Sequence, residues 1–134
     1  MADIRQKRVV DSGALQKTID SLNVPLSAVV TDGTYVYVSG LPPFDSETQT
    51  IVGGSIEDQT EQVLKNLEFA LESAGSSLDK VLKTTVYITN AVYFARFNDV
   101  YRKYFPIDPP ARTFVPIASF PLEFDLEIEC VALL

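Results

Sequence analysis

The C-terminal segment FDLEIECVALL (124–134) restricts the fold more than any other feature, because apolar residues alternate along nearly its whole length. Side chains of a β-strand point to the two faces of a sheet in turn. One face of this predicted strand is apolar throughout: Phe124, Leu126, Ile128, Cys130 and Ala132. The other face begins charged and ends apolar: Asp125, Glu127, Glu129, Val131 and Leu133. We therefore expect an apolar layer against the first face, and more than solvent against the second.

Two amphipathic helices are predicted to supply the apolar layer. The first is expected to start at Ser55, an N-cap residue followed three positions later by Asp58, and to stop at Gly75. Its apolar residues recur at spacings of three, four and seven: Ile56, Val63, Leu64, Leu67, Leu71 and Ala74. A second helix is expected between the cap Asn90 and the terminator Pro106. Four aromatic residues share one of its faces: Phe94, Phe97, Tyr101 and Tyr104.

The remaining segments predict strands. We expect strands at residues 35–40, 81–89, 112 to about 118 and 124–133. A further strand at 4–10 and a short helix near 15–22 are predicted in the N-terminal region. Residues 1–134 contain no internal repeat or linker, so we expect a single domain of class α+β, with two main helices on one face of a mixed sheet.

Two helices leave the second sheet face without a cover. Either other copies of the chain bury it, or the N-terminal segment folds across it. The change from charged to apolar residues along the last strand favours other copies. The tyrosines at 35, 37, 87 and 101 are expected in the core.

Composition excludes several classes of function. Eleven Lys and Arg against eighteen Asp and Glu give a net charge of −7 with scattered basic residues, so we expect no nucleic-acid partner. No apolar run approaches the length of a membrane span, and MADIRQKRVV lacks the apolar core of a signal peptide. We therefore expect no membrane association and a cytoplasmic location. The absence of histidine excludes Ser-His and Cys-His nucleophile pairs and the usual zinc sites.

Four polar residues are candidates for chemistry. Arg112 follows a stiff Pro-Pro-Ala lead, and its planar guanidinium can bind a carboxylate through two hydrogen bonds. The alternative is a strand-start arginine paired with a surface acid. If Glu127 or Glu129 is desolvated, the pKa of its carboxyl group rises into a range useful for proton transfer. If that strand face is solvated instead, the carboxyl pKa keeps its ordinary value. Asn98 lies among aromatic residues in the second helix, where an asparagine is usually solvated.

Five stretches, in the same order, resemble the Rid family, also called the YjgF or reactive intermediate deaminase family. They are VYVSGLPPFD, QTEQVLKNLEFALESAGSSLDKVLKTTVYIT, FARFNDVYRKYF, PPARTFV and DLEIECVA, within a region from about Asp32 to the end. The resemblance implies a chorismate-mutase-like subunit that forms a homotrimer. In such a trimer the sheets line a central barrel, and three clefts lie at subunit interfaces.

The same resemblance implies an activity. Family members hydrolyse reactive imines and enamines, such as 2-iminopropanoate and 2-iminobutanoate, to the 2-oxo acid and ammonia, and they use no metal or organic cofactor. By this resemblance Arg112 would hold the substrate carboxylate, and Glu127 would position and activate the attacking water. Gly40 would line the cleft with its backbone, and Asn98 would lie near the site.

Two positions depart from the family pattern. Leu26 stands where a tyrosine is usual, and Phe114 stands where a cysteine is common, two residues after Arg112. Both changes remove a polar group from the expected substrate-binding wall, so the substrate is expected to differ from the simplest imino acids. An enamine such as 2-aminomuconate is one alternative, and a trimer that binds 2-oxo acids without turnover is another. Ribonuclease and chaperone roles are also linked to the family. An acidic chain without histidine makes ribonuclease chemistry the weakest of these.

Overall fold

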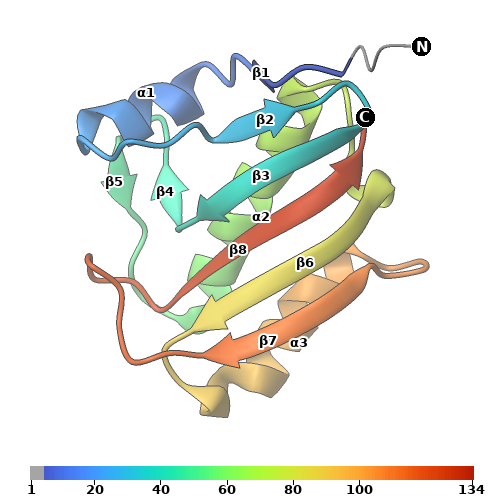
Figure 1. Cartoon of the computed structure of the whole chain (residues 1–134). Helices are drawn as coiled ribbons and strands as arrows, with labels where there is room; N and C mark the ends of the chain where they lie inside the picture. The colour runs from blue at the N-terminus through green and yellow to red at the C-terminus, as the bar shows by residue number, and fades with distance from the viewer. Residues whose placement is uncertain (1–4) are drawn as a thin grey trace.

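A computed structural model describes residues 5–134, and its framework is a six-stranded mixed sheet (Figure 1). The strands are β1 (Arg8–Val9), β2 (Val29–Thr31), β3 (Tyr35–Leu41), β6 (Val81–Ile88), β7 (Ala111–Pro116) and β8 (Leu126–Leu133). Their order across the sheet is β1-β2-β3-β8-β6-β7, and every neighbouring pair is antiparallel except β6–β7. The strands β4 (Phe44–Asp45) and β5 (Thr50–Ile51) form a separate hairpin.

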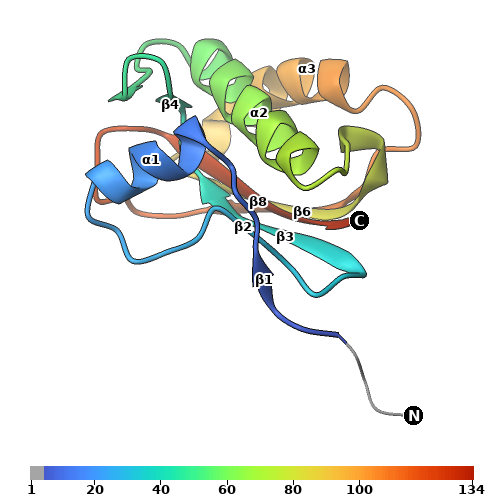
Figure 2. The ribbon, with the colours of Figure 1, turned by 90° about the horizontal axis from the view of Figure 1, so that it is seen from above.

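The two long helices, α2 (Ile56–Ser73) and α3 (Phe94–Tyr104), pack on the same face of the sheet (Figure 2). The Ser55 hydroxyl accepts a hydrogen bond from the Asp58 backbone N–H, as predicted for an N-cap. Asn90 caps the short 3₁₀ helix η2 (Ala91–Tyr93), which leads directly into α3. Gly75 follows α2 with φ of 82°, a conformation that favours glycine. The prediction of two helices on one face is confirmed.

The core lies between α2, α3 and the sheet. Its fully buried residues include Leu64, Leu67 and Leu71 of α2 and Phe97 of α3. On β8 the apolar set predicted from the alternation is buried beneath the helices, and the intervening residues point to the opposite side. We call that opposite side, which neither α2 nor α3 covers, the open face.

A β-bulge interrupts the pairing of β3 with β8 on the open face. Val38 pairs with Cys130 and Leu41 pairs with Ile128, so two residues of β3 stand opposite one residue of β8. Val38 and Leu41 are both buried under the helices. The two residues between them, Ser39 and Gly40, therefore lie toward the open face.

The N-terminal region departs most from the sequence prediction. The strand expected at 4–10 is reduced to Arg8–Val9, and Ile4 lies outside the described residues. β1 pairs with β2 at the edge of the sheet, so this part of the chain extends the sheet. The short helix near 15–22 is present as α1 (Ala14–Ser21). The sequence analysis did not predict β2, β4 or β5, because strands of two or three residues carry too little alternation to be recognised.

Two further expectations bear on the site. Tyr101 is buried as expected, but Tyr37 lies on the open face and exposes 44% of its surface.

Among residues 5–134, no helix is long and apolar enough to cross a membrane.

Candidate functional site

Arg112 points toward the helices because of its register on β7. It pairs with Thr84 of β6, and Phe114 pairs with Val86. Both partners are fully buried beneath the helices. Residues paired across neighbouring strands share a face, so the side chains of Arg112 and Phe114 lie on the α3 side of the sheet.

Four aromatic rings surround the Arg112 guanidinium. Its Cζ lies 4.9 Å from the ring centre of Tyr101 and 5.6 Å from that of Phe97. The corresponding distances to Phe94 and Phe114 are 5.7 and 5.8 Å. We call these four residues the aromatic enclosure. Three of them follow the helical spacing of α3, and each ring face attracts the cation. The enclosure holds the guanidinium in place without neutralising its charge.

The hydrogen-bonding capacity of Arg112 is available to a ligand. Within residues 5–134, no carboxylate forms an ion pair with this side chain. A cavity of about 310 Å³ lies beside it, lined also by Asn98, Pro109 and Pro110. The side-chain oxygen of Asn98 is buried and has no hydrogen-bond partner among the described residues. The pocket therefore offers a planar cation for a carboxylate, with the Asn98 side chain in its lining.

Glu127 lies on the open face. It pairs with Tyr87 of β6 and lines a second cavity, of about 460 Å³, together with Gly40. A Cβ atom at position 40 would lie 2.5 Å from the Glu127 Oε1 atom. Only glycine at this position of the bulge therefore allows the carboxyl group to approach the β3 backbone so closely.

Two causes raise the pKa of the Glu127 carboxyl above its ordinary value. Burial is the larger one, and the negative charge of Glu129 adds to it. The Tyr87 hydroxyl donates a hydrogen bond of 3.0 Å to Glu129, and this bond raises the pKa of Tyr87. Glu129 is thus held by its hydrogen bond to Tyr87. The Glu127 carboxyl, by contrast, forms no hydrogen bond or ion pair with a described residue.

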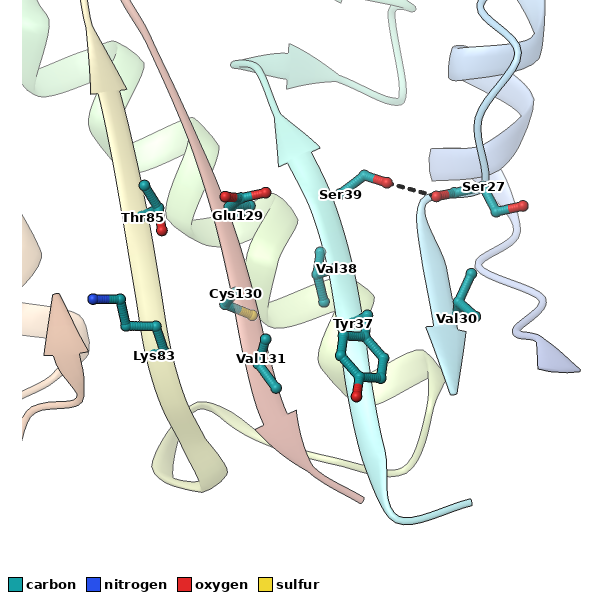
Figure 3. A pocket seen from close by; sticks show the side chains of 10 residues that line it. All are labelled: Ser27, Val30, Tyr37, Val38, Ser39, Lys83, Thr85, Glu129, Cys130 and Val131. Atoms are coloured by element: carbon teal, nitrogen blue, oxygen red, sulfur yellow. Dashed lines mark hydrogen bonds between the residues drawn. The ribbon is translucent and has the colours of Figure 1, made fainter. Parts of the chain in front are cut away.

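A neighbouring pocket of about 320 Å³ continues along the open face (Figure 3). Glu129 of β8, Lys83 and Thr85 of β6 and Tyr37 of β3 line it. The Ser39 hydroxyl donates to the Ser27 carbonyl at 2.7 Å and fixes the bulge to the chain before β2 (Figure 3). The Lys83 ammonium donates to the Thr113 hydroxyl at 2.7 Å.

The predicted site residues therefore form two groups on opposite faces. Arg112, Asn98 and Phe114 lie together beside α3, and Gly40 and Glu127 lie together on the open face. One chain does not bring the two groups to a common cavity. Among residues 5–134, no group of three or more Cys, Asp or Glu side chains could hold a metal ion.

Sequence reasoning missed two features of the site. The sequence did not predict that the aromatic residues of α3 contact Arg112, although the helical spacing of Phe94, Phe97 and Tyr101 places them on the face of α3 that meets it. The apolar walls of the larger cavity were also missed apart from Leu26. They come mainly from residues 22–26, after α1, and from residues 120–124, before β8, and Ile19, Pro42 and Phe44 complete them.

Comparisons with known proteins identify relatives of this chain. A family model described as endoribonuclease L-PSP matches residues 17–134. The chain is 40% identical over 110 residues to Reactive Intermediate Deaminase A, chloroplastic, of Arabidopsis thaliana, covering 82% of this chain and 59% of that protein. YyfA of Yersinia pestis, from the conserved Rid protein family, superposes with a TM-score of 0.87 at 35% identity, covering 96% of this chain and 100% of YyfA. TdcF of E. coli with bound serine superposes with a TM-score of 0.79 at 32% identity, covering 83% and 89%.

Proposed function

This chain belongs to the endoribonuclease L-PSP family, the YjgF/Rid proteins, and we propose that it is a hydrolytic deaminase of reactive imines and enamines. Its substrates on this proposal are 2-imino acids, of which 2-iminopropanoate and 2-iminobutanoate are the simplest. The products are the 2-oxo acid and ammonia. The family includes a protein named as a reactive intermediate deaminase, and the proposal extends that activity to this chain.

The observation that carries the proposal is the unneutralised guanidinium of Arg112 inside the aromatic enclosure. An acidic protein repels small anions unless it presents a local cation, and here that cation is held rigidly beside a cavity. A 2-imino acid carries a carboxylate that fits the guanidinium fork. Asn98, which lines the same cavity, would lie beside the bound ligand.

Glu127 would serve as the proton carrier. Its carboxylate accepts a proton from water while the water oxygen bonds to the imine carbon. The proton then passes to the nitrogen and gives a carbinolamine. Glu127 next takes the proton of the new hydroxyl group and passes it to the nitrogen as well, so that the C–N bond breaks, ammonia leaves and the C=O bond forms. The raised pKa of Glu127 suits both directions of transfer, and an imine carbon is electrophilic without a metal. An enamine substrate would first add a proton at carbon to become the imine.

The two groups of site residues must meet for this reaction, and we propose that they meet across subunits of a homotrimer. The open face carries exposed apolar side chains, among them Tyr37, Leu82 and Leu133, which another copy would cover. In that assembly Arg112 of one copy would approach Glu127 of the next, and the open faces would line a central barrel. TdcF, which superposes well, is a relative with a small molecule bound.

The proposal is tested by adding the protein to an amino-acid oxidase that generates 2-imino acids and following ammonia release. We expect faster release than from the oxidase alone, and loss of the effect in Arg112→Ala. If release is unchanged while 2-oxo acids still bind, the chain binds these acids without turnover.

A labelled RNA incubated with the protein in parallel tests the endoribonuclease activity named in the family's description. The net charge of −7 argues against that activity. The cytoplasmic location stays a prediction.

A further inference from the structure

The cavity beside Glu127 has more apolar wall than the proposed reaction needs. Its polar lining, which consists of Ser39, Gly40, Glu127 and Glu129, belongs to the sheet. The remaining walls are apolar and come from outside it. Four large apolar residues of these walls stay exposed: Leu22 at 38%, Val24 at 41%, Leu26 at 38% and Leu122 at 44%. Exposed apolar side chains gathered around one cavity mark a binding surface.

The first wall is held rigidly. The Gln16 amide of α1 donates to the Leu26 carbonyl at 3.0 Å and accepts from the Ala28 backbone N–H at 2.8 Å. The Leu26 backbone N–H donates in turn to the Val24 carbonyl at 2.9 Å. These bonds fix the segment that carries Val24 and Leu26, so its side chains form a preformed surface.

The second wall is anchored as firmly. The rings of Phe120 and Phe124 stack with their centres 4.4 Å apart. Directly after them, the Asp125 backbone N–H donates to the Gln59 side chain of α2 at 2.8 Å, and the Asp125 carboxylate accepts from Gln59 and Thr89. The loop is therefore tied to α2 and to Thr89, directly after β6.

We propose that this cavity holds the side chain of the substrate and selects 2-imino acids with large apolar side chains, branched aliphatic or aromatic, over the imine of alanine. The proposal rests on the proposed function, because it places the reacting carbon beside Glu127 and Gly40. The side chain then extends between the two apolar walls. A volume of about 460 Å³ is far larger than a methyl group can fill.

Selectivity follows from apolar burial. Each methylene group transferred from water to such a wall improves binding by about fourfold. A charged or hydroxylated side chain would lose its hydration there, because the walls away from the sheet present no polar side chain. Leu26, at a position where the family resemblance places a tyrosine, is therefore a specificity-determining residue in this account.

The test measures kcat/KM for imines generated from alanine, 2-aminobutanoate, leucine and phenylalanine by a flavin-dependent amino-acid oxidase. We expect the leucine and phenylalanine imines to exceed the alanine imine by at least about tenfold. In Leu26→Asn that ratio should fall about tenfold. Ile107→Asn is the matched control, since Ile107 is 81% exposed and lies outside the cavity, and it should keep the ratio. Similar kcat/KM values across the series would overturn the inference and leave the deaminase proposal intact.

If no imine is hydrolysed, the deaminase proposal fails and calorimetry decides the inference. Stable 2-oxo acids then serve as probes. We expect 4-methyl-2-oxopentanoate to bind at least about tenfold more tightly than pyruvate, and Leu26→Asn to abolish the difference. Equal affinities in the parent protein would contradict the assignment of the cavity.

Discussion

Arg112 and Glu127 project from opposite faces of one sheet, although their strands flank the same neighbour, β6. Arg112 pairs with the buried Thr84, whereas Glu127 pairs with Tyr87 on the open face. The sheet lies between the two side chains, so a change of rotamer cannot bring Arg112 and Glu127 of one chain to the same ligand. On the proposed function, therefore, each site takes Arg112 from one copy and Glu127 from another.

The first prediction concerns assembly. We expect sedimentation equilibrium to give a trimer at micromolar concentration. Tyr37→Arg places a charge on the open face, so it should dissociate the trimer. Phe69→Arg is the control, because Phe69 is 46% exposed, close to the 44% of Tyr37, but lies on α2. A stable monomer of the parent protein would exclude a shared site.

The second prediction concerns carboxylate capture by Arg112. Lysine keeps the charge but loses the planar fork, so Arg112→Lys should weaken calorimetric binding of a 2-oxo acid by roughly tenfold or more, and alanine by more. Arg96→Lys is a matched control, since Arg96 pairs with Glu57 at the surface. Unchanged binding in Arg112→Ala would place the carboxylate anchor elsewhere.

The third prediction concerns pH. Glu127 must be ionised to accept a proton from water, so kcat/KM should fall as the pH drops through its pKa. Burial and the Glu129 charge raise that pKa above the ordinary 4.5. In Glu129→Gln the charge is gone, the pKa falls, and the acid limb should move to lower pH. An acid limb that does not move would show that another group controls it.

The fourth prediction concerns the support beneath Arg112. The Tyr101 hydroxyl shares a 2.8 Å hydrogen bond with Thr84, which is fully buried. Tyr101→Phe leaves the Thr84 hydroxyl unpaired and should lower the free energy of unfolding by about 1–3 kcal/mol in urea titrations. Tyr37→Phe, at an exposed position, should change it by less than about 0.5 kcal/mol. Equal effects of the two changes would argue against a role for the buried bond.

The sequence predicted those parts of the fold that local patterns determine. The alternation from Leu126 to Leu133 assigned both faces of β8 correctly, and Ser55 marked the start of α2. The placement of Arg112 depends on the parallel pairing of β7 with β6, and no short-range pattern encodes which face an edge strand presents. The bulge at Ser39 and Gly40 likewise depends on register with β8. The roles of Gly40, Asn98, Arg112, Phe114 and Glu127 stay predictions, as does a single domain over residues 1–134.

A site built from two copies can be tested by mixing two variants. Glu127→Gln alone should lower turnover by roughly 10²- to 10⁴-fold, since it removes the proton carrier, and Arg112→Ala should remove the carboxylate anchor. Equal amounts of the two variants, unfolded together and reassembled, produce mixed trimers. Some sites then combine an intact Arg112 with an intact Glu127 from the next copy.

The turnover of that mixture tests the central claim most directly. If each site draws on two copies, about a quarter of the sites should recover and turnover should rise to about a quarter of the parent value. Each variant reassembled alone should keep its own low turnover. If mixed trimers form and turnover remains at the level of the single variants, Arg112 and Glu127 do not act on one ligand across subunits, and the account is contradicted.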